Sequence, residues 1–285
     1  MVRKPTIAIV GPGRLGSALA MALSKSGFRI SQILAQDRLA SQNKARTLAS
    51  RVQAQATKLG NPEVHADLIW LCVPDGAIAS VARQLARTGS WKGKLAFHSS
   101  GALASDELAV LRRRGAAVAS VHPMMTFVSR SAPSLKGVAF GLEGDSAAIK
   151  AARKIVLTLG GEAFLIRKRD KAAYHAWGAF TSPLLVAALV TGEQVARAAG
   201  LTLTQARKRV LPIVYQTLDN YFRLGPAASF SGPLIRGDIE TVRKHLAVLK
   251  KTPKALEVYI ALARSALRGL PVRRRGELER ILRAP

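Results

Sequence analysis

The first 167 residues alternate between short β-branched strand patterns and amphipathic helix patterns, whereas the rest of the chain has only helical patterns. This order predicts an α/β domain with a doubly wound, mainly parallel sheet, followed by an all-α second domain. Glycines at the first strand-to-helix turn and polar residues at later strand ends support the same interpretation. We expect a nucleotide-binding domain over residues 1–167, a helical domain for substrate and dimerisation over 168–270, and a basic, loosely packed tail over 271–285.

The first turn carries glycines in a spacing typical of dinucleotide-binding domains. Residues 6–10 form a strand pattern, and a helical pattern starts at residue 15. Between them lies G-x-G-x-x-G, in which the glycines allow a tight turn, approach of a pyrophosphate and close helix–strand contact. The helix-start amides would then point at the phosphates, although glycine-rich turns also occur without a ligand. The turn predicts a Rossmann-type site at Gly11, Pro12, Gly13, Arg14, Leu15 and Gly16.

The end of the second predicted strand, residues 28–35, carries opposing signals for the two nicotinamide cofactors. Asp37 follows about twenty residues after the glycine turn, where an acid binds the ribose 2′-hydroxyl of NAD. Arg38 and Lys44 come next and supply the positive charge that would hold the 2′-phosphate of NADP. Asp37 is equally compatible with the N-cap of the following helix, so the sequence leaves the cofactor choice open.

Three later strand patterns, residues 67–73, 95–98 and 118–121, end in groups suited to a ligand site. The first is almost continuously apolar, which is typical of a strand buried on both faces. The carboxyl ends of strands form the ligand crevice of a doubly wound sheet. The first two strands therefore predict cofactor contacts from Val73, Pro74, His98 and Ser99. Residues 125–136, a segment containing serine and proline, are expected to wall the site.

Asp75 and the two strand-end histidines also have simpler interpretations. Asp75 is well placed to cap the helix that follows it. His98 and His122 can polarise a carbonyl or orient a nicotinamide amide, but hydrogen bonding of a histidine to backbone is more common. No cysteine or carboxylate stands at ligand spacing with them, so they do not indicate a metal site. We take His122 as a candidate for binding substrate.

A polar stripe marks the first helix of the predicted second domain. Lys171, Tyr174 and His175 fall at i, i+3 and i+4, and Ser182 returns to nearly the same direction two turns later. Their neighbours are apolar, and an unsatisfied buried polar group costs on the order of 1–3 kcal/mol, so the stripe needs partners such as a substrate. Hydride transfer to a carbonyl or imine also needs a proton donor, for which Lys171 and His175 are candidates. Alternatively, Lys171 faces solvent while Tyr174 and His175 pack against the first domain.

The glycine- and proline-containing turn over residues 231–238 supplies a further candidate contact. Arg236 can anchor a carboxylate through two parallel hydrogen bonds. Asp238 is more simply explained as the N-cap of the next helix. We expect Arg236 and Ser182 to bind substrate between the two domains.

Composition limits the other function classes. The longest apolar stretch, residues 176–190, is shorter than a membrane span, and the single cysteine, Cys72, cannot form an internal disulfide. These features favour a cytoplasmic protein without a membrane partner. The net charge of +27 raises nucleic-acid binding as a rival. However, the basic residues are scattered and aromatic residues are too few for base stacking, so we expect no specific nucleic-acid partner.

Several motifs, taken as a set, resemble those of one oxidoreductase family. They run in the family's order along nearly the whole chain: Gly11–Gly16, Val73–Asp75, His98–Gly101, His122–Pro123, Phe140–Gly144, Lys171–His175 and Gly232–Asp238. The chain thus resembles the Rossmann-like oxidoreductases whose second domain is known as domain of unknown function 2520. More distantly it is similar to pyrroline-5-carboxylate reductases and β-hydroxyacid dehydrogenases. The resemblance implies NADP binding, with NAD possible, a homodimer formed through the helices, and a catalytic role for Lys171.

The chain departs from this family pattern at two positions. Gln36 stands where the family usually has an arginine after the second strand, and Pro183 stands where an asparagine usually follows the serine. Pro183 predicts a kink at Ser182, because proline removes an amide donor and disfavours helix at the residue before it. We expect an NAD(P)-dependent oxidoreductase acting on a small hydroxy acid, keto acid or imine. The alternative is a dinucleotide-binding sensor or partner-docking protein without turnover.

Overall fold

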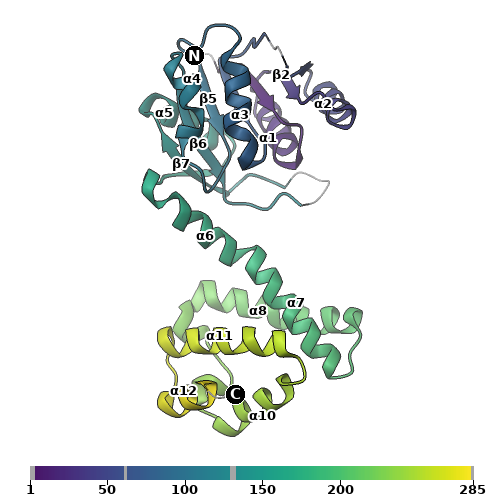
Figure 1. Cartoon of the computed structure of the whole chain (residues 1–285), viewed down its shortest axis with the longest axis vertical. Helices are drawn as coiled ribbons and strands as arrows, with labels where there is room; N and C mark the ends of the chain where they lie inside the picture. The colour runs from purple at the N-terminus through teal and green to yellow at the C-terminus, as the bar shows by residue number, and fades with distance from the viewer. Residues whose placement is uncertain (1–3, 61–62, 129–132, 284–285) are drawn as a thin grey trace. The chain divides into compact units, whose positions relative to one another are not determined.

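The computed structural model describes residues 4–60, 63–128 and 133–283, shown as ribbons in Figure 1. The chain divides into two compact units, Met1–Ala179 and Phe180–Pro285. The division falls later than the predicted boundary, because side chains at the start of α6 (Lys171–Thr181) are buried in the first unit.

The first unit is built on an eight-stranded sheet in the order β3-β2-β1-β4-β5-β6-β7-β8. Among the described strands, the β6–β7 pair is antiparallel and every other neighbouring pair is parallel. This confirms the predicted doubly wound, mainly parallel α/β sheet. The strands are β1 (Ile7–Val10), β2 (Ile30–Ala35), β3 (Gln55–Lys58), β4 (Leu68–Leu71), β5 (Leu95–His98), β6 (Ala117–Pro123), β7 (Ala139–Gly144) and β8 (Glu162–Leu165).

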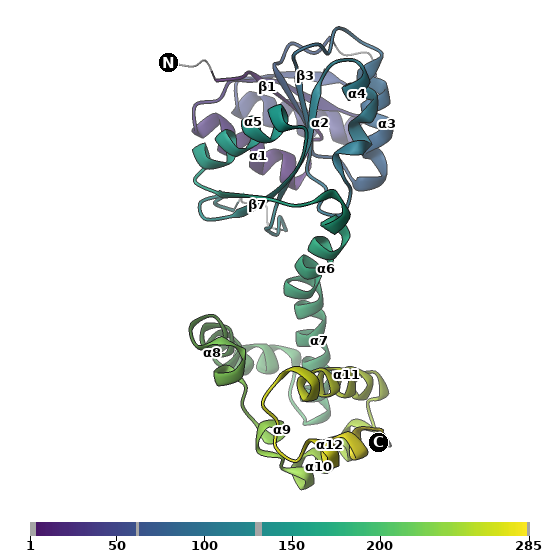
Figure 2. The same ribbon diagram turned by 90° about the vertical axis from the view of Figure 1, so that its left-hand side faces the viewer.

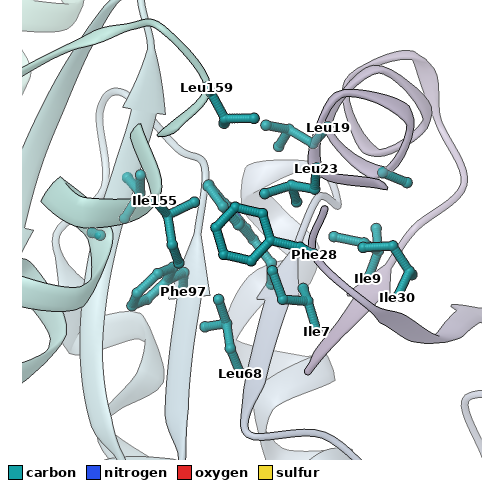
Figure 3. Close-up of a cluster of buried hydrophobic side chains, with 14 of the residues drawn as sticks. Ile7, Ile9, Leu19, Leu23, Phe28, Ile30, Leu68, Phe97, Ile155 and Leu159 are labelled. Carbon is teal, nitrogen blue, oxygen red and sulfur yellow. The ribbon is translucent and has the colours of Figure 1, made fainter. Parts of the chain in front are cut away.

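Helices cover both faces of this sheet, as the continuous apolar strands require. Ile7 and Ile9 of β1 belong to one core, and the alternate residues Ala8 and Val10 belong to another. The first core includes side chains of α1 (Arg14–Lys25), α2 (Leu39–Arg51) and α5 (Ser146–Thr158). Figure 3 shows Leu19 and Leu23 of α1 and Ile155 of α5 around Phe28 in this core. The second core includes α3 (Asp75–Ala86), the 3₁₀ turn η1 (Ser105–Leu108) and α4 (Ala109–Arg113).

Among its described residues, the second unit contains helices and connecting segments but no strand, which confirms the predicted all-α region. Its helices are α7 (Pro183–Ala198), α8 (Leu203–Ser229), α9 (Pro233–Arg236), α10 (Ile239–Leu249), α11 (Pro253–Gly269) and α12 (Arg275–Arg283). Helix α8 is interrupted at Gly225, where φ is 79°. The kink predicted at Pro183 is confirmed, because Ser182 has φ −129° and ψ −83°, between the end of α6 and the start of α7.

The C-terminal segment packs more closely than the sequence suggested. We expected the basic tail to be loosely packed, and this was wrong for residues 275–283, which form α12. Leu278 and Leu282 are fully buried in a small core with residues of α10 and α11. Figure 2 shows these three helices together within the second unit. Two leucines four residues apart place their side chains on one helix face, which outweighs the dense positive charge around them.

Candidate active site

The glycine turn closes tightly on its neighbours and leaves the start of α1 uncovered. Gly11 has a φ of 100°, and a Cβ there would lie 2.5 Å from the carbonyl oxygen of Cys72. A Cβ on Gly16 would lie 2.0 Å from the carbonyl oxygen of Gly11, so both positions require glycine. Gly13 is the N-cap of α1, has open space around it and makes no side-chain cap. The first amides of α1 are therefore available for an anion.

A cavity of about 620 Å³ adjoins this turn, between α1 and α2. The cations Arg14, Lys44 and Arg51 line it together with apolar side chains, and its described lining contains no carboxylate. Phe127 also lines it, from the segment expected to wall the site, although residues 129–132 of that segment lie outside the described residues. A lining that combines cations with apolar side chains suits an anionic ligand that also has an apolar part.

The acid after β2 is paired with a lysine on the neighbouring strand. Asp37 Oδ1 lies 2.9 Å from Nζ of Lys58 at the end of β3. The alternative in which Asp37 caps the next helix was wrong, because α2 begins at Leu39 with Arg38 as its N-cap residue. Arg38 itself is exposed beside this ion pair. The edge where a ribose would lie thus carries one carboxylate that a cation already neutralises.

Residues after β4 and β5 join the two neighbouring strand ends. A Cβ on Gly11 would lie 3.1 Å from Cγ1 of Val73, so the chain leading to Pro74 passes directly beside the glycine turn. Asp75 was expected to cap α3, but the helix begins at Asp75 and Pro74 is its N-cap. The Asp75 carboxylate instead accepts a 2.9 Å hydrogen bond from Ser100 Oγ. Ser99 Oγ accepts a 2.8 Å hydrogen bond from the Trp70 indole, which anchors the start of the same loop.

His98 is a structural residue of this loop. Its Nδ1 accepts a 3.1 Å hydrogen bond from the Ser100 amide, so Nε2 carries the proton and donates to the Ala104 carbonyl at 3.0 Å. Burial lowers the pKa of His98 to about 4, which keeps the ring neutral. Both ring nitrogens are therefore bonded to backbone groups, and neither is left for a cofactor. This agrees with the simpler interpretation of His98, in which the histidine hydrogen-bonds to backbone.

Lys171 lies in the interior, and the alternative in which it faces solvent was wrong. The side chain is 2% exposed. Its Nζ donates to the carbonyl of Ser100 at 2.9 Å and to Oγ of Ser120 at 2.5 Å. Burial lowers the pKa of Lys171 to about 8, while the carboxylates of Glu143 and Asp75 partly oppose the shift. An ammonium with a pKa near neutrality can donate or accept a proton at physiological pH.

A second cluster joins β6 to α6 around Gly101. The Tyr174 hydroxyl lies 2.7 Å from Nδ1 of His122, and the two rings are nearly perpendicular. The His175 ring lies 6.2 Å from that of His122, centroid to centroid. A Cβ on Gly101 would lie 2.7 Å from Cδ2 of His175 and 2.9 Å from Nε2 of His122, so a larger residue there would displace one of the two rings. Three of the predicted site residues, His122, Lys171 and His175, thus come together at adjacent strand ends.

Two family models match most of the chain between them. Residues 2–123 match the Rossmann-like domain, and residues 138–266 match the domain of unknown function DUF2520. The chain is a Rossmann-like protein with a DUF2520 domain. The second match begins at β7, so it includes α6 and the residues Lys171, Tyr174 and His175. No protein of curated function matches the chain.

Solved structures share the fold of this Rossmann-like/DUF2520 protein. A Bacteroides fragilis protein provisionally named an NADP oxidoreductase has a TM-score of 0.76 and 24% identity, over 92% of this chain and 97% of that one. A reductive aminase from Aspergillus terreus, solved with NADPH, has a TM-score of 0.66 and 17% identity, over 98% and 100%. A pyrroline-5-carboxylate reductase from Coxiella burnetii has a TM-score of 0.59 and 16% identity, over 92% and 98%. At these identities the likeness establishes a shared fold.

Two predicted residues of the DUF2520 domain belong to the second unit. Ser182 precedes α7 and does not cap it through its side chain. Arg236 is exposed at the end of α9. The prediction for Asp238 is confirmed, because its Oδ1 accepts a 3.1 Å hydrogen bond from the Thr241 amide at the start of α10. Ser182 and Arg236 remain predicted substrate contacts.

Two polar residues of the Rossmann-like sheet were missed from the sequence. Ser120 lies in the middle of β6 and bonds to Lys171. Glu143 is buried on β7, where its carboxylate accepts hydrogen bonds from the amide and hydroxyl of Ser105 at 2.6 and 2.9 Å. A usable signal existed in both cases, because a polar residue inside an otherwise apolar strand must have a buried partner.

Proposed function

We propose that this protein is an NADP-dependent oxidoreductase that acts on a small hydroxy acid, keto acid or imine. The observation that carries the proposal is an uncapped glycine turn at the end of β1 together with the buried Lys171. The pKa of Lys171 is lowered to about 8, and its ammonium contacts Ser100 after β5, two strands away. The turn supplies an anion site for a pyrophosphate, and the lysine supplies a proton close to where a nicotinamide would lie. The shared fold with NADPH-bound enzymes supports the same reaction class.

The charges around β2 favour NADP over NAD. The one acid in position for a ribose hydroxyl, Asp37, is already paired with Lys58. Arg38 is exposed beside it, and Arg14 and Lys44 line the adjoining cavity. Cations of this kind stabilise a 2′-phosphate, whereas NAD needs a free carboxylate for its 2′-hydroxyl. Gln36 replaces the family arginine, so Arg38 and Lys44 would take over its role.

The proton required by the reaction is assigned to Lys171, with His175 as the second candidate. Bound NADP(H) would supply or accept the hydride. Two of the Lys171 ammonium protons are used by Ser100 and Ser120, which leaves the third for the heteroatom of a substrate. His175 is exposed beside Gly101, where its ring can reach a bound molecule.

Cofactor binding can be tested by titrating NADPH and NADH into the full-length chain in a calorimeter. In the Gly13→Val variant a side chain fills open space over the α1 amides, so we expect NADPH affinity to fall at least about tenfold with little change in folding stability. Gly276→Val is a matched control, because Gly276 also stands at a helix start with open space around it. Wild-type protein that binds neither nucleotide, or Gly13→Val that binds as wild type, would contradict the assignment.

The donor role requires a turnover substrate, found by screening short keto acids, hydroxy acids and cyclic imines with both nicotinamides. Lys171→Met keeps a side chain of similar length and should lower kcat by about 10²-fold or more, with NADPH affinity unchanged. His175→Ala tests the second candidate in the same assay. Unchanged kcat in both variants would reject the donor assignment.

The alternative of a sensor without turnover is favoured by one observation. Lys171 is almost completely enclosed by protein atoms, so a substrate must approach the one proton that its two hydrogen bonds leave free. Tight NADPH binding with no oxidation or reduction of any compound in the panel would support the sensor. Turnover that depends on Lys171 would exclude it.

We propose in addition a homodimer formed through the helical unit. Large apolar side chains of α7 and α8 are exposed, including Val186, Ile213 and Phe222. Several large apolar side chains exposed on neighbouring helices are typical of an interaction site. By length and composition alone, the helical stretch Lys168–Ala198 would also suffice to cross a membrane. A second copy and a bilayer are distinguished by sedimentation of the protein with and without lipid vesicles, where the dimer predicts self-association without lipid.

A further inference from the structure

The contact between His122 and Tyr174 has no part in the proposed proton transfer. Nδ1 of His122 lies 2.7 Å from the Tyr174 hydroxyl, and Nε2 is on the opposite side of the ring, toward Gly101 and His175. Tyr174 is buried at the start of α6. A buried hydroxyl so close to a ring nitrogen determines which of the two nitrogens carries the proton.

Burial of the Tyr174 hydroxyl decides the direction of this hydrogen bond. Gly141 lies opposite His122 in the β6–β7 ladder, and a Cβ on Gly141 would lie 3.0 Å from the hydroxyl oxygen, so glycine makes room for it over this strand. Within the described residues, the hydroxyl is hydrogen-bonded to Nδ1 of His122. If Nδ1 carried the proton, the buried hydroxyl proton would have no acceptor among these residues, whereas donation to Nδ1 satisfies it.

We infer that Tyr174 is a positioning residue that holds His122 as the Nε2–H tautomer, so that an N–H group is presented beside Gly101 to an acceptor atom of the substrate. The inference rests on the proposed function for its substrate, which is then a carbonyl oxygen, carboxylate oxygen or imine nitrogen at this point. A group that can only donate, such as an ammonium, does not fit. The opposite tautomer would place a lone pair against the substrate oxygen.

The electrostatic surroundings keep both members of the pair neutral. Burial, together with the positive charge of Lys171, lowers the pKa of His122 to about 4. His175 and His98 act in the same direction, and Asp75 opposes them. Burial raises the pKa of Tyr174 to about 12, so the hydroxyl keeps its proton. His122 therefore binds an acceptor as a neutral donor and leaves proton transfer to Lys171 or His175.

The tautomer can be read directly by long-range ¹⁵N–¹H NMR of the full-length chain labelled on its five histidines. His122→Gln identifies the His122 signals. We expect wild-type His122 to show one protonated nitrogen, Nε2, at pH 7. In Tyr174→Phe the hydroxyl is lost, and we expect the signals to move toward a mixture of both tautomers.

The chain offers a matched control in its second unit. Tyr259 OH lies 3.1 Å from Nδ1 of His245, with the rings again nearly perpendicular. Tyr259→Phe should therefore leave the His122 signals unchanged. Wild-type His122 protonated on Nδ1, or a Tyr174→Phe spectrum identical to wild type at His122, would overturn the inference. The wild-type spectrum alone decides the first point if Tyr174→Phe does not fold.

A functional readout separates this inference from the proposed function. With a carbonyl substrate, Tyr174→Phe should raise KM several-fold more than it lowers kcat, because the group it orients binds the acceptor atom. NADPH titration stays independent of this result. If the wild-type protein did not bind NADPH, the cofactor proposal would be refuted. If the His122 tautomer were unchanged in Tyr174→Phe, only the role of Tyr174 would be refuted.

Discussion

The two units depart from the usual distribution of polar and apolar residues in opposite directions. The first buries polar side chains, including Lys171, His98 and Glu143, and each has hydrogen-bond partners within the unit. The second exposes apolar ones, and Phe222 and Ile213 on α8 are 80% and 64% exposed. Buried polar groups are tolerated because the chain itself satisfies them, whereas exposed apolar surface is stabilised only by a partner from outside. The first pattern indicates a preorganised site, and the second indicates an interface.

The largest expected effect compares how much a buried phenylalanine of the first unit and an exposed phenylalanine of the second unit contribute to the free energy of unfolding. Phe97 is fully buried and packs edge-on against Trp70, with ring centroids 5.4 Å apart. Phe97→Ala should lower the free energy of unfolding by about 3–5 kcal/mol. Phe222→Ala, measured at protein concentrations low enough to favour the monomer, should change it by about 0.5 kcal/mol or less. If chemical denaturation gave equal losses of unfolding free energy for the two variants, the surface of α8 would be covered by other residues of the same chain.

The second prediction concerns self-association through the exposed helices. Ile213→Glu and Phe222→Glu place charge on apolar surface, so each should weaken the dimer at least about tenfold, equivalent to about 1.4 kcal/mol. Sedimentation velocity over a concentration series measures this. Leu157→Glu is the control, because Leu157 is an exposed leucine on α5 of the first unit. A dimer that responds only to the Leu157 substitution would place the interface on the other unit.

The third prediction follows from the lowered pKa of Lys171. Its pKa is about 8 in the folded chain and 10.5 when unperturbed, so the unfolded state binds more protons between these values. Stability contributed by this group is therefore constant below pH 8 and rises between pH 8 and pH 10.5. Denaturant unfolding should show that the free energy of unfolding of the wild type, relative to that of Lys171→Met, is larger at pH 10 than at pH 7.5. The absence of any difference between the two proteins would mean that Lys171 is solvated.

The smallest expected effect concerns the ion pair of Asp37 and Lys58, whose charged side chains are exposed to solvent, as charged side chains usually are. Lys58→Ala frees the Asp37 carboxylate for a ribose 2′-hydroxyl and repels a 2′-phosphate. The ratio of NADPH to NADH affinity should therefore fall a few-fold, in line with the modest energy of exposed pairs. Calorimetry of both nucleotides measures it, with Lys150→Ala as an exposed lysine remote in sequence. An unchanged ratio would show that Asp37 does not face the ribose.

Local patterns explain which predictions were confirmed. The alternation of strand and helix, the turn at Gly11 and Gly16, the kink before Pro183 and the cap by Asp238 depend on residues close together in the chain. The cap expected for Asp75, and the cap that was one alternative for Asp37, were wrong for the opposite reason. Their partners are Lys58 at the end of β3 and Ser100 in the loop after β5, and only the pairing of the strands brings them within reach.

The amino-acid sequence by itself determined the order of elements, the two kinds of domain and the glycine turn, because hydrophobic period, proline and glycine act over a few residues. The tertiary structure decided that Lys171 is buried against Ser100 and Ser120, and that Tyr174 meets His122. These contacts join residues more than fifty positions apart, and they exist because β5 and β6 are neighbours in the sheet with α6 packed at their ends. The spacing of residues in the sequence does not indicate which strands will be neighbours, because that is settled only when the strands pair.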